Sequence, residues 1–343
     1  MITVHSEQHR LHAPRGEISG GEMVTPFESP FRADLVLQAV RDAVLGPVIA
    51  PDAFPLDTAL KVHEPAYLRF LETAWPRWHE AGYRGDAIPT CFQARRMAQR
   101  PPDDIDGLLG YYAFAAETSI AEGSWQAALA ASHCALTGAR LLQTGERAAF
   151  ALCRPPGHHA ARDLFGGYCF LNNAAIAARF LRDDGADRVA VLDVDFHHGN
   201  GTQDIFYDRG DVLFASIHGD PKHAFPHFLG FADETGSGAG AGLTANYPLP
   251  PGTGYDRWSE ALADALSRIR AFGAEALVVS LGVDTFERDP ISFFRLTSDD
   301  FTRYGETIGC LGLPTLFCLE GGYGVPEIGL NAANVLGGLE QAR

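Results

Sequence analysis

The chain has 343 residues, and 27 Lys and Arg against 43 Asp and Glu give it a formal net charge of −16 with neutral His. Such an acidic chain is unsuited to coating nucleic acid or an anionic membrane, because both require clustered cationic side chains. The composition, 46% hydrophobic and 20% charged, excludes a disordered or fibrous chain. The acid excess alone indicates no more than solubility.

The cysteines and the N-terminal residues indicate the compartment. The six cysteines contain no C-x-x-C pair, which predicts reduced thiols and no cysteine-rich zinc site; they are Cys91, Cys134, Cys153, Cys169, Cys310 and Cys318. The start M-I-T-V-H-S-E-Q-H-R lacks the basic end and apolar core of a signal peptide, and no apolar run is long enough to cross a bilayer. We therefore expect a cytoplasmic protein without membrane or nucleic-acid partners.

The first half of the chain is less regular than the second. Residues 76–110 mix Trp, Tyr, Phe and several Arg with a P-P-D-D turn. A connection this long is usually functional or an interaction element, although a tolerated surface insertion is an equal alternative. No linker-like segment is apparent, so one domain over residues 1–343 is predicted.

Nearly continuous apolar runs recur through the second half, as expected for strands buried on both faces. They cover Ala148 to Cys153, Arg188 to Val194, Val212 to Ile217, Ala276 to Leu281 and Pro314 to Leu319. Helical periodicity appears between them, over residues 174–181, 258–272 and 301–311. This alternation predicts an α/β fold with a doubly wound, mostly parallel sheet and helices on both faces, which binds ligands beyond the carboxyl ends of its strands.

The strongest local signal is D-V-D-F-H-H-G-N-G, from Asp193 to Gly201, after the strand R-V-A-V-L. Asp195 and His197 share a face if the strand alternation continues, and Asp284 follows another buried strand. Three such ligands would leave one position open, which is typical of catalytic zinc. The alternative for the D-x-H pair alone is an Asp that caps the next helix and a solvated His.

Two further strand ends carry groups suited to amide chemistry. His158 and His159 follow A-A-F-A-L-C and are candidates for proton transfer, with Asp193 and Asn200 as partners that set tautomer and charge. Tyr323 follows L-F-C-L-E-G-G and offers a phenol donor to an oxyanion. The alternatives are a buried, hydrogen-bonded histidine pair and a packing aromatic.

The motifs together resemble a known family over nearly the whole chain. P-P-G-H-H, F-G-G-Y-C-F-L-N-N, D-V-D-F-H-H-G-N-G-T-Q, S-L-G-V-D and E-G-G-Y-G resemble the zinc-dependent histone deacetylase superfamily, which has the arginase-deacetylase fold. Within it, the start of the chain, the 76–110 segment and H-G-D-P-x-x-A-F-P-H-F-L-G look like bacterial acetylpolyamine amidohydrolases.

The resemblance implies roles for individual residues. Asp195, His197 and Asp284 would hold one Zn²⁺, which Fe²⁺ could replace, beside the paired His158 and His159 and the phenol of Tyr323. Further implied positions are aromatic tunnel walls and a structural K⁺ site: Tyr168 and Phe225 for the walls, and Asp193, Asp195, His197, Ser216 and Ile217 for K⁺.

The resemblance also implies an assembly. The 76–110 insertion would mediate a homodimer and narrow the active-site mouth, where Asp106 and Glu117 would attract a polyamine. Asn200 departs from the Asp of many histone deacetylases and leaves His159 with a neutral partner. Ureohydrolases of the same fold hold two manganese ions with carboxylates where this chain has Gly199 and Phe286, so one metal ion is expected here.

The predicted reaction is zinc-dependent hydrolysis of the acetyl amide of small cationic acetylated amines such as N-acetylputrescine and N-acetylcadaverine. Zinc and Tyr323 would polarise the carbonyl while the His158 and His159 pair moves protons. Three alternatives remain. They are a deacetylase of acetyl-lysine in proteins, a non-catalytic module that binds acetylated amines and, least favoured, a two-manganese ureohydrolase.

Overall fold

The computed structural model describes residues 1–94 and 96–342, and its centre is an eight-stranded parallel sheet. The strand order is β4-β1-β5-β10-β9-β6-β7-β8. The strands are β1 (Ile2–Val4), β4 (Val48–Ile49), β5 (Ala148–Ala151), β6 (Val189–Asp193), β7 (Val212–Gly219), β8 (Thr244–Leu249), β9 (Ala276–Leu281) and β10 (Thr315–Leu319). A separate antiparallel hairpin pairs β2 (Glu17–Ser19) with β3 (Glu22–Val24).

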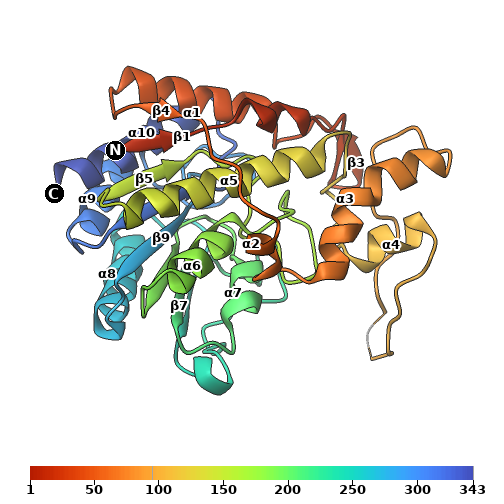
Figure 1. Ribbon diagram of the computed structural model, residues 1–343. Helices are drawn as coiled ribbons and strands as arrows, with labels where there is room; N and C mark the ends of the chain where they lie inside the picture. Colours follow the sequence, from red (N-terminus) through yellow and green to blue (C-terminus); the bar gives the residue numbers. More distant parts are fainter. Residues whose placement is uncertain (95, 343) are drawn as a thin grey trace.

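Helices cover both faces of this sheet, which confirms the predicted doubly wound α/β fold (Figure 1). One face carries α1 (Pro30–Asp42), α8 (Tyr255–Phe272), α9 (Ser298–Gly309) and α10 (Glu327–Gln341). The other carries α2 (Asp57–Leu60), α3 (Pro65–Glu80), α4 (Ile105–Tyr111), α5 (Ser124–Gln143), α6 (Asn173–Asp183) and α7 (Asn200–Phe206). Two short 3₁₀ helices complete the chain, η1 (Glu7–Leu11) and η2 (Gly238–Gly240).

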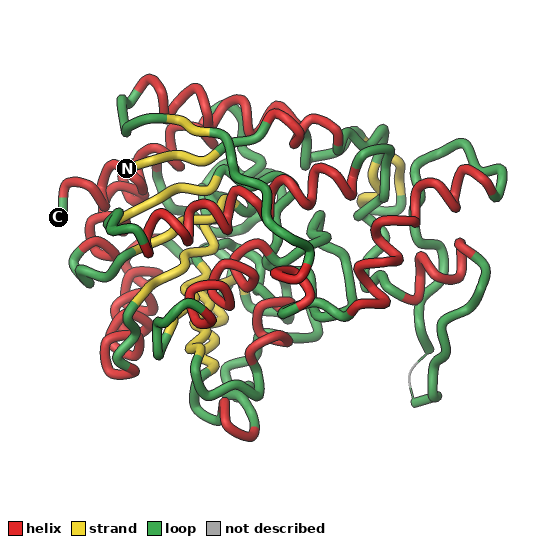
Figure 2. The backbone as a smooth tube through the Cα atoms, viewed as in Figure 1, coloured by secondary structure: helices red, strands yellow, loops and turns green. Residues whose placement is uncertain are grey.

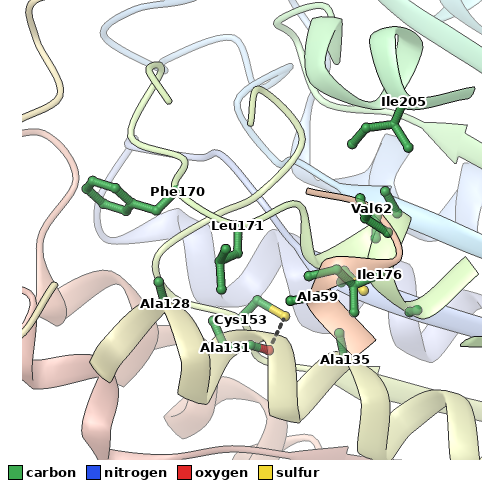
Figure 3. Packing of buried hydrophobic residues seen from close by; sticks show 14 of the residues in the cluster. Ala59, Val62, Ala128, Ala131, Ala135, Cys153, Phe170, Leu171, Ile176 and Ile205 are labelled. Carbon is green, nitrogen blue, oxygen red and sulfur yellow. Dashed lines mark hydrogen bonds between the residues drawn. The ribbon is translucent and has the colours of Figure 1, made fainter. Parts of the chain in front are cut away.

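The sheet divides the core into two hydrophobic clusters because successive side chains of a strand point to opposite faces. In β6, for example, Val191 packs with the α5 and α6 side while Leu192 packs with α8 and α9. Figure 3 shows the first cluster, in which small alanines of α5, including Ala131, let this helix lie close to its neighbours. The buried thiol of Cys153 contacts the carbonyl oxygen of Ala131 at 3.5 Å.

Local sequence explains the ends of the predicted helices. The Asn172 side chain accepts the Ala175 N–H at the start of α6, and Thr297 forms a capping box with Asp300 at α9. Gly273 ends α8 with a φ of 74°, in the left-handed region that glycine adopts without strain.

The structure corrects the view of residues 76–110 as one irregular connection. Residues 76–80 form the last turn of α3, and residues 105–110 belong to α4, so the irregular part is residues 81–104, of which Arg95 lies outside the described residues. Pro76 lies inside α3 and removes one helical hydrogen bond, but the helix continues past it with Trp78 on its buried face. Figure 1 shows α3, α4 and β3 at one end of the molecule, far from both chain termini.

All six cysteines are free, four of them buried. No helix in the described ranges is long and apolar enough to cross a bilayer.

Candidate active site

Four loops bring the predicted site residues together at one edge of the sheet. The strands that precede them, β5, β10, β9 and β6, are consecutive neighbours in the sheet, and parallel strands end at a common edge. His158 and His159 follow β5, Tyr323 follows β10, and Asp284 follows β9. Figure 2 shows loops and turns, drawn in green, between the strands of the sheet and the helices.

Asp195 and His197 reach the site from a loop, and not from the strand alternation that the sequence suggested. Strand β6 ends at Asp193, so both residues follow it. Backbone N–H groups then set their orientation: Asp195 accepts from Gly321 at 2.7 Å and from His197 at 2.8 Å, and its own N–H donates to Asp193 at 3.1 Å.

Asp195, His197 and Asp284 form a compact, buried group of metal-ligating side chains. One ligand atom from each lies within 4.8 Å of the others. Nδ1 of His197 is 3.0 Å from Oδ2 of Asp284 and 3.3 Å from Oδ1 of Asp195. The Phe196 N–H donates to Oδ1 of Asp284 at 2.8 Å, which leaves Oδ2 directed at the imidazole.

Glycine makes room for the two carboxylates. A Cβ on Gly321 would lie 2.5 Å from Oδ2 of Asp284 and 2.6 Å from Oδ2 of Asp195. Real side chains do not approach this closely, so the E-G-G turn after β10 has to expose bare backbone here. The same turn presents Tyr323.

The electrostatics of this group fit a divalent cation. Burial and the neighbouring Asp195 carboxylate raise the pKa of Asp284. Burial would also raise the pKa of Asp195, but His158 and His197 hold it below its ordinary value. Two carboxylates this close repel each other unless a positive charge lies between them. One imidazole and two carboxylates are ligands that Zn²⁺ accepts, and they leave a position open for water or substrate.

The two predicted histidines have different surroundings. His158 contacts Oδ2 of Asp193 through Nδ1 at 3.0 Å. Burial disfavours its charge, but Asp195 and Asp193 outweigh burial and raise the pKa of His158 to about 10. His159 donates from Nδ1 to Oδ1 of Asn200 at 2.7 Å, and burial together with the charged His158 lowers its pKa well below the ordinary value. The pair therefore consists of one cationic and one neutral imidazole.

A cavity of about 430 Å³ opens onto His159 and His197. This volume suits a small organic molecule. The predicted wall residues Tyr168 and Phe225 both line the cavity, together with Phe27, Phe196 and Phe293. The Phe225 ring packs edge-on against His159 with centroids 5.1 Å apart, and Tyr168 lies 5.6 Å from Tyr323.

Tyr323 lines the same cavity and stays protonated. Burial raises its pKa well above the ordinary value, although Arg32 opposes the change. The guanidinium of Arg32 lies 4.6 Å from the centroid of the Tyr323 ring. The backbone N–H of Tyr323 donates to Asp289 at 2.7 Å, which holds the loop. Tyr323 is therefore a positioned phenol donor.

Two carboxylates line the cavity, Glu17 and Glu117. Glu117 accepts the Gly167 N–H at 2.8 Å, beside Tyr168, whose φ of 66° is strained for a side chain other than glycine. Glu17 accepts from the Tyr168 hydroxyl at 3.1 Å. Burial raises the pKa of Glu17 to about 7.

Of the four predicted substrate-binding residues, Asp106 is the one that the fold of one chain does not bring to this cavity. It lies on α4, with Oδ1 3.5 Å from the Thr90 hydroxyl, and is not among the residues that line the cavity.

Of the positions implied for K⁺, Asp193 and Ser216 are paired in neighbouring strands β6 and β7. Asp195 and His197 directly follow β6, and Ile217 follows Ser216 in β7.

The sequence reasoning singled out neither Glu17 nor Arg32. Glu17 belongs to a short hairpin far from the motifs in sequence, and its tertiary contact with Tyr168 decides its place in the cavity. Arg32 resembles any helical arginine, but it is buried and donates to the carbonyl oxygens of Gly322 and Glu320. A charged residue on the apolar face of α1 is the signal that could have identified it.

Comparison with known proteins places this site in a family. Residues 26–339 match the histone deacetylase domain. The chain belongs to the histone deacetylase family. It is 62% identical over 339 residues to acetylpolyamine amidohydrolase of Mycoplana ramosa, with 99% of each chain covered. It is 56% identical over 340 residues to acetylpolyamine amidohydrolase 2 of Pseudomonas aeruginosa, also with 99% of each covered.

Solved structures of this family share the fold. The crystal structure of acetylpolyamine aminohydrolase from Burkholderia pseudomallei matches with a TM-score of 0.95 and 41% identity, covering 100% of this chain and 99% of that one. The HDA15 HD domain matches with a TM-score of 0.81 and 27% identity, covering 98% and 87%. The resemblance to acetylpolyamine amidohydrolases and the arginase-deacetylase fold are thereby confirmed.

Proposed function

We propose that this protein is a zinc-dependent hydrolase that removes the acetyl group from acetylated diamines and polyamines, N-acetylputrescine and N-acetylcadaverine among them. The observation that carries the proposal is the buried group of Asp195, His197 and Asp284, which lies beside an aromatic cavity that two carboxylates also line. The high identity to acetylpolyamine amidohydrolases over the full chain supports a hydrolase of acetylated amines.

The metal would supply Lewis acidity to the amide carbonyl and to the attacking water when bound by Asp195, His197 and Asp284. His159 is the general base in this scheme, because its neutral imidazole lines the cavity and keeps Nε2 free to accept a proton. It then returns that proton to the departing amine. His158 stays cationic beside Asp193 and opposes the negative charge of the transition state.

Tyr323 donates its phenolic hydrogen to the carbonyl oxygen as negative charge develops there. Tyr168 and Phe225 enclose the narrow acyl-amine portion of the substrate, and Glu17 and Glu117 attract its cationic amine. A small cationic acetylated amine is therefore the partner that the cavity suits.

The same proposal includes an assembly of two chains. A single domain over residues 1–343 would form a cytoplasmic homodimer in which segment 76–110 reaches the partner and narrows the active-site mouth. Asp106 would act only in such a dimer, because one chain alone keeps it off the cavity. A K⁺ ion near Asp193 and Ser216 would be structural.

The test is a substrate panel on metal-analysed protein. We expect a chelator to abolish hydrolysis of N-acetylputrescine and N-acetylcadaverine, and Zn²⁺ or Fe²⁺ to restore it. Full activity in metal-stripped protein would refute the metal-dependent mechanism. Faster hydrolysis of an acetyl-lysine peptide than of either diamine would reassign the substrate class, and no hydrolysis by metal-replete protein would leave a binding module.

A further inference from the structure

A second group of metal-ligating side chains lies on the N-terminal segment, outside the active site. His5 directly follows β1, and Glu7 and His9 belong to η1, so the three residues alternate over five positions. One ligand atom from each lies within 4.8 Å of the others. Nε2 of His5 is 3.4 Å from Oε1 of Glu7. Two ligands of a tetrahedral zinc ion are separated by about 3.3 Å, given bonds of about 2.0 Å.

The two imidazoles lack the partners that buried histidines normally have. His5 is 7% exposed and His9 is 2% exposed. Among the residues that the structure describes, none of their four ring nitrogens makes a hydrogen bond. Buried polar groups without partners are rare in folded proteins, and an ion is one of the few explanations for them. The two rings are tilted by 53° to each other, with centroids 5.2 Å apart.

Carboxylates and guanidinium groups both surround this group. Glu7 and Asp34 add negative charge, and Oδ1 of Asp34 lies 3.8 Å from Nε2 of His9.

One cation already occupies the exposed edge of this group. The exposed guanidinium of Arg10 bridges Glu7 and Asp34, with Nε 3.0 Å from Glu7 and Nη1 2.9 Å from Asp34. Ion pairs at exposed positions are weak, so a divalent ion can displace this arginine from Glu7. Arg154, on the inner side, donates to the carbonyl oxygen of His9 and is neutralised by the buried Glu28.

We propose that His5, Glu7 and His9 form a second metal site, for a divalent first-row ion such as Zn²⁺, separate from the active site. Two imidazoles and one carboxylate are a ligand set that zinc accepts with a fourth position left open. The site joins the loop after β1 to η1, so a bound ion would stabilise the folded N-terminal segment.

The test is a titration of purified enzyme that holds one equivalent of Zn²⁺ in the active site. Calorimetry with further Zn²⁺ should show a second equivalent, and elemental analysis after gel filtration should count two ions per chain. We expect His5→Phe to abolish binding of the second equivalent and Glu7→Gln to weaken it at least tenfold. Glu146→Gln, at an exposed position elsewhere, should leave it unchanged.

Glu7 is exposed, so its substitution tests the proposal even if His5→Phe disturbs folding. If the enzyme binds only one equivalent of Zn²⁺, and Asp284→Asn loses it while Glu7→Gln keeps it, the second site is overturned and the ion belongs to the active site. If only one equivalent of Zn²⁺ binds, and Glu7→Gln loses it while Asp284→Asn keeps it, the ion occupies the second site. That result would count against the zinc-dependent function proposed above.

Discussion

His158 and His159 are adjacent in sequence, yet their surroundings leave His158 cationic and His159 neutral. The Asp193 carboxylate stabilises the imidazolium of His158, whereas the Asn200 amide offers His159 only a neutral acceptor. A cationic His158 4.0 Å from the His159 ring then disfavours a second positive charge. One residue type thereby supplies both a fixed charge and a proton acceptor.

The lack of room for a side chain at Gly321 can be tested by substitution. Gly321→Ala places a methyl group against both carboxylates of the metal group, so we expect the purified protein to lose most of its active-site metal and at least 100-fold in kcat/KM, about 2.7 kcal/mol. Gly324→Ala is the matched control, because its Cβ would approach other atoms no closer than 3.4 Å. Metal analysis that finds equal content in both variants would contradict this account of the turn.

The charge of Glu117 at the cavity can be tested by substitution. Glu117→Gln removes one charge from the cavity, and we expect the KM for cationic acetylated diamines to rise about tenfold, with a neutral N-acetylalkylamine unaffected. If the proposed dimer brings Asp106 to the active-site mouth, Asp106→Asn should raise the KM of the cationic substrate alone, and an unchanged KM would count against that role. An equal rise in KM for charged and neutral substrates would show that Glu117 acts by position and not by charge. Steady-state kinetics on both substrates makes the comparison.

At the scale of elements, a buried carboxylate ties α1 to two active-site loops. Glu28, just before α1, accepts from Arg154 after β5 at 2.7 Å and from Arg32 of α1 at 3.0 Å. Arg32 in turn donates to the carbonyl oxygens of Glu320 and Gly322 after β10. The helix thus holds the loop that carries Tyr323 to the loop that carries the histidine pair.

Glu28→Gln should therefore destabilise the protein strongly, because two buried guanidinium groups lose their shared counter-charge. The expected loss in the free energy of unfolding is about 3–5 kcal/mol. Arg268→Gln, which breaks an exposed ion pair with Asp264 on α8, should cost less than about 1 kcal/mol. Urea denaturation measures both, and similar losses in the two variants would argue against the network.

At the scale of the whole molecule, the net charge of −16 is distributed over the surface, while the active site depends on a few buried groups. Buried histidines also make the stability of the fold depend on pH. His63 joins α2 and α3 to the site loops, since its Nδ1 contacts the carbonyl oxygen of Ala161 at 2.9 Å and its Nε2 accepts from the Asn172 N–H at 3.0 Å.

Burial lowers the pKa of His63 to about 4, against about 6.5 in an unfolded chain. Between these values the unfolded chain binds more protons, so the stability contributed by His63 is complete above pH 6.5 and is lost as the pH falls toward 4. The total loss is about 3 kcal/mol. We expect unfolding measured from pH 7 to 4 to show a shallower slope in His63→Gln than in the exposed control His79→Gln. Equal slopes of the free energy of unfolding against pH in the two variants would show that His63 does not contribute to the pH dependence.

Sequence patterns alone were enough to predict the α/β class, the strand ends that carry polar side chains and the candidate metal ligands Asp195, His197 and Asp284. Each of these depends on local patterns: continuous apolar runs, strand-end polar residues and glycine turns. The helices of the first half escaped prediction because packing defines their buried faces, although Ser29 with Pro30 and Pro65 are start signals for α1 and α3.

Which distant side chains meet depends on the folded chain. It placed β5, β10, β9 and β6 side by side, brought Glu17 to Tyr168 and Arg32 beneath Tyr323, and kept Asp106 outside the cavity. It also buried His5 and His9 without hydrogen-bond partners among the described residues. Burial and through-space charge set each group's protonation state, and neither can be read from the order of residues along a chain.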